Sequence, residues 1–184
     1  MSLSTRTGDG GNTGLMYNRR VAKTHPQVEA CGAVDELSAT LGVARTLTSE
    51  PWVEEQIYRM QKDLVALMGE LAVAPEDHAR YAQDKYPKMS PETLARLDAG
   101  VLELESQDIT FTGWATPGGT PLSAALDVAR TVCRRAERSM LRAREEGALA
   151  PDLAFHIMNR LSDFLWLLAR RDETLHPPPA RTSE

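Results

Sequence analysis

A helix that begins at Pro121 constrains this chain more than any other feature of its sequence. Thr120 can act as the N-cap, Pro121 suits the first helical position, and Gly118 and Gly119 keep the approach flexible. At about 100° per residue, an apolar arc and a charged face lie on opposite sides of residues 121–141. The arc consists of Ala129, Val132, Cys133, Ala136 and Met140. The chain must therefore bury one side of a long helix, as helical bundles do.

The charged face of this helix carries Arg130, Arg134 and Glu137, with Arg135 and Arg138 on its flank. Four guanidinium groups so close together repel one another unless an anion binds. One interpretation is a solvated surface, because charge runs are common on helices. The other is a polyanion site, in which the guanidinium groups bind phosphate oxygens and Glu137 holds them in place. The helix alone leaves both interpretations open.

Composition excludes several classes of function. The formal net charge of −5 and the pI near 5.5 argue against a general binder of nucleic acid or of anionic membranes. No apolar run approaches the roughly 20 residues of a membrane span, and no signal peptide is visible, so we expect a cytoplasmic protein. Cys31 and Cys133 lack CxxC spacing, which indicates neither a disulfide framework nor a zinc site.

The N-terminal segment from 4 to 14, which reads STRTGDGGNTG, has no apolar period and is predicted to be a loop. Its glycines allow close approach of the backbone, and its hydroxyl and amide groups can surround phosphates. It lacks the Walker GK[ST] pattern, and a flexible terminus has the same composition. Arg19, Arg20 and Lys23 follow and can add positive charge beside the loop.

Helical periodicity predicts four more helices, at residues 27–47, 51–74, 91–104 and 151–171. Residues 75–89 have little apolar pattern and are expected to form a long exposed loop, and 109–115 a short extended link. We expect residues 173–184, which contain three consecutive prolines, to be a disordered tail. The chain is thus predicted to be one all-α domain spanning 1–184, an up-down, ferritin-like bundle of five helices.

The last predicted helix has an unusual polar side. Opposite its apolar face lie Phe155, Asn159, Asp163, Trp166 and Arg170. Asn159 and Asp163 can be ordinary surface residues, but their aromatic neighbours favour a face that is partly covered. Asp35, in the first helix, is either an exposed acid or a partner for an arginine of the central helix.

Five motifs in register resemble the PduO-type ATP:cob(I)alamin adenosyltransferases. In chain order they are TRTGDGGNTGL, RVAK, VEACGAVDELSATLG, PGGTPLSAALDVARTVCRRAER and NRLSDFLWLLAR, which together run from Thr5 to Arg170. The resemblance implies transfer of the 5′-deoxyadenosyl group of ATP to the Co(I) of cobalamin or another corrinoid, with release of triphosphate. An ATP-binding sensor or an adenosylcobalamin chaperone with little turnover is the alternative.

The resemblance also implies an assembly and its partners. It implies a homotrimer with active sites between subunits, Mg²⁺ held mainly by ATP rather than by a defined set of side chains, and no contact with nucleic acid or membrane. A flavoprotein reductase would supply reduced cobalt, and an adenosylcobalamin-dependent enzyme would receive the product.

Carried over position by position, the resemblance gives roles to individual residues. Residues 1–26 would form the N-terminal ATP-binding loop. Within it, the residues that would surround the triphosphate are Thr5, Thr7, Gly8, Asp9, Gly11 and Thr13, with Lys23 adding charge. Arg130, Arg134 and Glu137 would bind the nucleotide together with Asn159, and the two arginines would be catalytic. Asp35 would pair with Arg130 across the subunit interface, and Asp163 would support the arginines.

Two positions depart from the family's usual pattern. In the family, an aromatic residue shortly before the central helix displaces the lower ligand of cobalt, which eases reduction to Co(I). Trp114 stands where phenylalanine is expected, three residues before Pro117, and tryptophan is larger and carries an N–H group. Asn18 stands where the family often has glycine. We expect Trp114 to take the catalytic aromatic role on the cobalt side.

Overall fold

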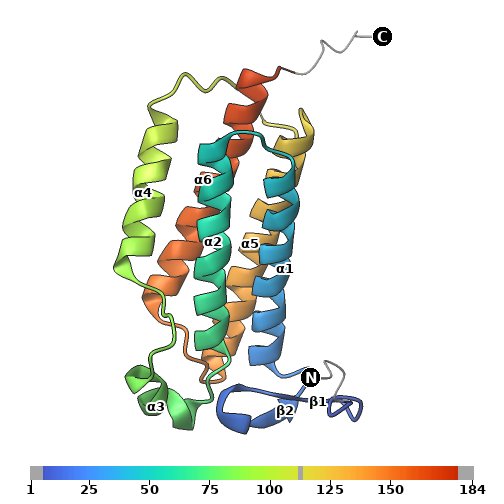
Figure 1. The fold of residues 1–184 in the computed structure, drawn as a ribbon. Coiled ribbons are helices and arrows are strands. Elements are labelled where there is room, and N and C mark those ends of the chain that lie inside the picture. The colour runs from blue at the N-terminus through green and yellow to red at the C-terminus, as the bar shows by residue number, and fades with distance from the viewer. Residues whose placement is uncertain (1–5, 112–113, 178–184) are drawn as a thin grey trace.

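The computed structural model describes residues 6–111 and 114–177, and its long helices lie side by side in an up-and-down bundle (Figure 1). The long helices are α1 (Pro26–Thr46), α2 (Pro51–Leu71), α4 (Pro91–Glu105), α5 (Pro121–Glu145) and α6 (Asp152–Leu175). Packing contacts join α1 to α2 and α5, and join α6 to α5 and α4. The predicted central helix therefore lies between α1 and α6.

The ends of α5 form as its sequence predicts. Thr120 Oγ1 accepts the Ser123 N–H at 2.9 Å, and the Thr120 N–H donates to Ser123 Oγ at 3.0 Å, which makes a capping box. Gly147 has a φ of 89°, a left-handed conformation that suits glycine after a helix end. The predicted N-cap residue is confirmed, and the C-cap of the helix is Glu146, with Gly147 directly after it.

The core lies along the apolar faces of the five long helices. The predicted arc of α5 is buried throughout, from Ala129 to Met140. Helices α4 and α6 approach closely at Gly100, where a Cβ atom would lie 2.5 Å from Cε2 of Phe164. Any larger residue at Gly100 would therefore force the two helices apart.

Smaller elements gather at one end of the bundle, opposite the end where α6 finishes (Figure 1). Strands β1 (Asn12–Gly14) and β2 (Arg20–Ala22) pair antiparallel around the 3-10 turn η1 (Met16–Asn18). The 3-10 turn η2 (Pro75–Asp77) and α3 (His78–Gln83) follow α2 at this end. None of the helices described is long and apolar enough to cross a membrane.

The prediction was right in its helical class and wrong in its count and some boundaries. The described residues include six α-helices, because α3 lies within the segment 75–89 that was expected to be a loop. At six residues, α3 is too short to show a helical period. Residues 1–26 were expected to be a loop but include the hairpin, which a backbone hydrogen bond from Met16 N to Ala72 O, 2.9 Å long, ties to the bundle.

The last helix is longer than predicted. Residues 173–175 were assigned to the disordered tail but belong to α6, while residues 178–184 lie outside the described part of the chain. Glu173 accepts hydrogen bonds from the Gly119 N–H at 3.2 Å and from Ser123 Oγ at 2.8 Å. These tertiary contacts with the start of α5 hold the final turn of α6, and no local sequence pattern reveals them.

Candidate functional site

The N-terminal segment folds into turns beside Lys23. The Asp9 N–H donates to Arg6 O at 3.3 Å, and the Gly11 N–H donates to Gly8 O at 3.2 Å. Gly11 has a φ of 81°, and its carbonyl accepts the Lys23 N–H at 2.9 Å. A cation and a series of short turns therefore occupy one place, as the phosphate-loop interpretation expects.

The three threonines predicted for this loop differ in where they lie. Thr7 is exposed, and its carbonyl accepts a hydrogen bond from Arg20 Nη2 at 2.8 Å. Thr13 lies in β1 opposite Val21. Thr5 lies outside the described residues.

Two side chains fasten the hairpin to the segment that follows α2. Arg19 makes a two-pronged ion pair with Asp77, with Nε–Oδ2 at 2.6 Å and Nη2–Oδ1 at 3.0 Å, and this guanidinium lowers the pKa of the Asp77 carboxyl. Tyr17 donates to Asp84 Oδ2 at 2.5 Å, and burial together with this bond raises the pKa of Tyr17 to about 12. Arg19 was expected to add charge beside the loop but is committed to Asp77.

The turn between the strands explains one departure from the family pattern. Tyr17 and Asn18 have φ values of 58° and 63°, in the left-handed region. Glycine adopts this region freely, and asparagine is the side-chain-bearing residue that tolerates it best. Asn18 therefore satisfies the same backbone requirement as the glycine that it replaces.

The charged face of α5 continues onto α6. Arg130 is half-buried, Arg134 is exposed and Glu137 is half-buried, and their spacing of four and three residues puts all three on one side of α5. The Cys133 thiol donates to Met158 O of α6 at 3.3 Å, which sets the exposed Asn159 at the level of this charged face. That Asn159 and the charged residues of α5 bind one nucleotide stays a prediction.

The pKa of the buried Cys133 thiol depends on burial and on the charges around it. Burial raises its pKa, and the nearby carboxylates of Glu137 and Asp163 raise it further, while Arg134 opposes them. Asp163 also pairs with Arg160 Nη1 at 3.5 Å on its own helix. Asp163 was predicted to support the arginines of α5. The ion pair that the structure shows for Asp163 is with Arg160 of its own helix, so support of the α5 arginines stays a prediction.

Trp114 and Arg130 share a cavity of about 280 Å³ on this face. Asp127, Trp166 and Ala115 complete its lining. Phe111 packs edge-on against Trp166, with ring centroids 5.0 Å apart, whereas Trp114 is 95% exposed and lies at the open side. The structure therefore places the predicted aromatic residue beside the first arginine of the charged face.

Periodicity placed Arg170 on the polar side of the last helix, which was expected to be partly covered, but the structure buries this residue fully. Its side chain is 1% exposed, and Nη2 contacts Asp127 Oδ2 at 2.5 Å. Sequence reasoning also missed Asp127 and assigned no role to Trp166 in a cavity. The available signal was an acid at position 127 among the apolar residues of α5, three residues before Arg130.

Asp35 is exposed on α1 and does not pair with Arg130 within the chain. Among the described residues Asp35 makes no ion pair, and the ion pair of Arg130 is with Asp127, at 3.4 Å from Nε. The next residue, Glu36, pairs with Arg135 of α5. Pairing of Asp35 across a subunit interface therefore stays a prediction.

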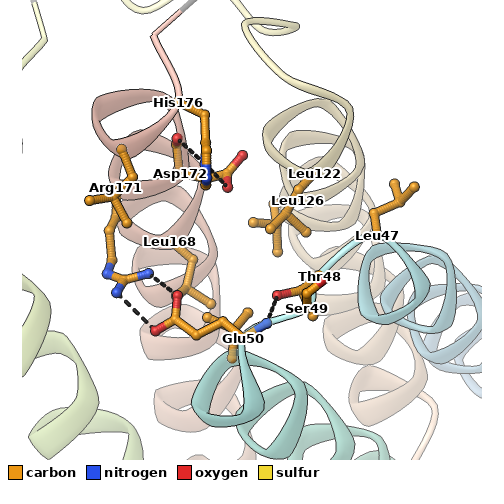
Figure 2. A pocket seen from close by; sticks show the side chains of 12 residues that line it. Leu47, Thr48, Ser49, Glu50, Leu122, Leu126, Leu168, Arg171, Asp172 and His176 are labelled. Atoms are coloured by element: carbon orange, nitrogen blue, oxygen red, sulfur yellow. Dashed lines mark hydrogen bonds and ion pairs between the residues drawn. The ribbon is translucent and has the colours of Figure 1, made fainter.

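A second cavity, of about 550 Å³, lies at the end of the bundle where α6 finishes (Figure 2). Its apolar floor includes Leu122, Leu126 and Leu168. Its charged groups satisfy one another, since Arg171 donates to both carboxylate oxygens of Glu50 at 2.6 and 2.9 Å. It contains none of the predicted site residues. Over residues 6–111 and 114–177, no cluster of three or more His, Cys, Asp or Glu side chains is arranged to hold a metal ion.

Known proteins with similar sequences share one activity. The sequence model described as "Cobalamin adenosyltransferase" matches residues 3–171. The chain is 36% identical to the corrinoid adenosyltransferase of Mycobacterium leprae, over 91% of this chain and 89% of that protein. It is 35% identical to the corrinoid adenosyltransferase PduO of Citrobacter freundii, over 94% of this chain, and it spans only 50% of that relative.

Solved structures agree with the sequence comparison. A variant PduO-type ATP:corrinoid adenosyltransferase from Lactobacillus reuteri, complexed with cobalamin and ATP, matches with a TM-score of 0.84 and 30% identity, over 100% of this chain and 98% of that one. A second variant of the Lactobacillus enzyme, complexed with ATP, matches with a TM-score of 0.83 and 27% identity, over 95% and 96% of the two chains.

Proposed function

Because the chain belongs to the cobalamin adenosyltransferase family, we propose that it transfers the 5′-deoxyadenosyl group of ATP to the Co(I) of cobalamin or another corrinoid. One structural observation carries this proposal beyond family membership. Arg130 lines a cavity with Trp114, and Arg134 and Glu137 continue along the same face of α5. Groups suited to a triphosphate and a wall suited to a flat macrocycle therefore adjoin.

The reaction requires the protein to position its two substrates and does not require a protein nucleophile. The Co(I) of the corrinoid substrate attacks C5′ of ATP, the cobalt–carbon bond forms, and the C5′–O bond breaks with its electron pair leaving on triphosphate. The protein must hold C5′ within reach of cobalt and stabilise the negative charge of the leaving group. A site with arginines and aromatic residues, and with no nucleophilic serine or cysteine, suits this task.

Within this site, we assign Arg130 and Arg134 to the phosphates, since guanidinium groups bind phosphate oxygens in a planar, two-pronged geometry. Glu137 and Asn159 would orient the nucleotide from α5 and α6. Trp114, large and apolar, would cover the lower face of the corrinoid and exclude water there.

The N-terminal loop would hold the other end of the triphosphate. Its exposed backbone turns and Lys23 supply donors and one positive charge, and Thr5, Thr7, Gly8, Asp9, Gly11 and Thr13 would surround the phosphates. Mg²⁺ would be held mainly by phosphate oxygens, and when bound it would offset part of their charge.

We also propose a homotrimer with active sites between subunits. The hairpin lies at one end of the bundle, and the end of α4 and the start of α5 lie at the other (Figure 1). Trp114 lines a cavity with Arg130 in the first half of α5. A site that uses the loop of one subunit and the α5–α6 face of its neighbour would bring the loop residues and the helix residues together. In such an assembly, Asp35 would pair with Arg130 of the next subunit. A flavoprotein reductase and an adenosylcobalamin-dependent enzyme as partners follow from the resemblance alone, and a cytoplasmic location stays a prediction from the sequence.

The test is an anaerobic assay of the purified protein with Mg-ATP and chemically reduced cobalamin. We expect the Co(I) absorbance to fall, a light-sensitive alkylcobalt spectrum to appear, and triphosphate to be released in equal amount. If ATP binds but no cobalt–carbon bond forms, the transferase proposal is overturned and an ATP-binding sensor or chaperone takes its place.

A further inference from the structure

A buried arginine lies directly behind the face that we propose as the active site. Arg170 is 1% exposed and is one of the largest fully buried side chains among the described residues. Burying a cation is costly unless it is paired, and an apolar residue of similar volume usually fills such a place at no loss of stability. Core packing alone therefore does not explain why an arginine stands here.

The partners of Arg170 connect it to the site. Its Nη2 contacts Asp127 Oδ2 at 2.5 Å, and the other oxygen of Asp127, Oδ1, lies 3.4 Å from Nε of Arg130. Asp127 is only 4% exposed, so water screens these contacts little. The carboxylate is thus shared between a buried arginine and an arginine that lines the cavity.

A second contact reaches the aromatic wall of the same cavity. The Arg170 guanidinium lies over the ring of Trp166, with Cζ 5.8 Å from the ring centroid, at cation–π distance. Trp166 in turn packs against Phe111 and lines the cavity with Trp114. Arg170 therefore reaches both the charged side and the aromatic side of the cavity through one neighbour each.

Charge balance indicates what this arrangement does. Arg170 and Arg130 carry two positive charges, and Asp127 and Glu173 carry two negative ones, with Arg170 Nε 3.2 Å from Glu173 Oε2. Without Arg170, Asp127 would have Arg130 as its sole described partner and would draw that guanidinium toward the core. With Arg170 in place, Asp127 touches Arg130 at Nε only, and both Nη groups can face a substrate.

We propose that the buried Arg170–Asp127 pair is a positioning device for the adenosyl transfer, which holds Arg130 and Trp166 in their working orientation. This inference rests on the proposed function. Its effect belongs in the catalytic step, because a displaced guanidinium no longer meets the charge that develops on the leaving triphosphate.

The decisive variant removes both charges of the pair. Arg170→Met alone would leave Asp127 buried without its main partner and is expected to destabilise the fold. Arg170→Met combined with Asp127→Asn nearly keeps the side-chain volumes and removes both charges of the buried pair. Arg130 and Glu173 each lose a partner, but both are half-buried, and Glu173 keeps its hydrogen bonds from Gly119 and Ser123. We expect this double variant to melt close to the parent, to lower kcat by about tenfold or more, and to change KM for ATP by less than about threefold.

A matched control lies one residue further along α6. Arg171→Met with Glu50→Gln removes another two-pronged arginine–carboxylate pair, which lies at the second cavity (Figure 2). We expect its kcat to stay within about twofold of the parent. Equal losses in the two double variants, or a parental kcat in the Arg170/Asp127 double variant, would overturn the positioning role.

Two further measurements keep the test decisive. The first is the Arg170→Lys variant, which retains the positive charge but loses the planar, two-pronged geometry of the guanidinium. If the double variant does not fold, a parental kcat in Arg170→Lys overturns the proposal, and a reduced kcat supports it. The parent is assayed first. If it forms no cobalt–carbon bond, the proposed function fails and this role fails with it, whereas an active parent with an unaffected double variant removes the positioning role alone.

Discussion

The side chain of Lys23 lies against Gly8, so that a Cβ atom at Gly8 would be 3.3 Å from both Cε and Nζ of the lysine. The same Cβ would lie 3.4 Å from the carbonyl oxygen of Asn12. The lysine ammonium and the loop backbone thus occupy one small volume, and a Cβ atom at Gly8 would oblige the end of the lysine side chain to shift by a few tenths of an ångström.

Gly8→Ala is therefore expected to push Lys23 away from the proposed triphosphate site. We expect KM for ATP to rise by about fivefold with a smaller effect on kcat, and the melting temperature to stay within about 2 °C of the parent, because the loop is exposed. Steady-state kinetics with varied ATP measures this. Gly10→Ala is the matched control, since a Cβ atom there meets nothing within 4 Å. A parental KM in Gly8→Ala would remove Lys23 from the ATP site.

Arg134→Ala is expected to lose most activity while the assembly survives. The side chain is exposed, so its removal costs little stability, and its guanidinium is assigned to the charge that develops on triphosphate. Losing one such donor lowers kcat by about 100-fold. Light scattering checks the oligomeric state, and the adenosylation assay checks turnover. Arg138→Ala, another exposed arginine of α5, should retain activity within about twofold, and full turnover by Arg134→Ala would contradict the assigned role.

Glu70 makes stability depend on pH. Its side chain is buried, Oε1 accepts the Met89 N–H at 3.0 Å, and Oε2 has no partner within the described ranges. Burial raises the pKa of Glu70 above its unfolded value, so the folded state takes up this proton first and gains stability as pH falls through the raised pKa. Above this raised pKa the ionised carboxylate therefore costs stability.

Glu70→Gln should then raise the melting temperature by about 2–4 °C at neutral pH, because the amide keeps the acceptor and removes the buried charge. The gain should shrink as pH falls toward the unfolded pKa of glutamate, about 4.3. Thermal melts across pH follow this difference. Glu54→Gln, at an exposed position of the same helix, should show no such trend. A gain that is constant with pH would mean that ionisation of Glu70 is not its origin.

The sequence predicted the long helices because each has its own local signals. Pro121 after Thr120 marks the start of α5 and Gly147 marks its end, and the apolar arc from Ala129 to Met140 fixes the buried side. The family motifs also indicated the residues of the charged face, because residues spaced by three and four along one helix share a side whatever surrounds them.

Features that depend on contacts between distant segments were not predictable in the same way. The hairpin is held by Arg19–Asp77 and Tyr17–Asp84, pairs that join residues 58 and 67 positions apart. Periodicity predicts that Arg170 lies on the polar face of its helix, yet it is buried against Asp127, 43 positions away. A charge on an apolar side can be recognised only when its partner is known.

A variant of Trp114 can distinguish the reduction of Co(II) to Co(I) from the adenosyl transfer that follows it. Its ring is 95% exposed at the cavity that it shares with Arg130, so replacing it should cost the fold little. Trp114→Ala should slow adenosylation that starts from Co(II) by about tenfold or more, because water and the lower ligand regain access to cobalt and reduction becomes harder. Starting from chemically reduced Co(I), the loss should be much smaller, because that step is bypassed.

Trp114→Phe serves as the control, since it keeps an apolar ring and should retain most of the rate from both starting states. The comparison needs both assays on the same preparations, with the spectrum of bound Co(II) corrinoid recorded as well. In the parent and in Trp114→Phe we expect the signature of cobalt without a lower ligand, and in Trp114→Ala its loss. Equal losses from Co(II) and Co(I) would show that Trp114 shapes the corrinoid site in general, and the ligand-displacing role would then be abandoned.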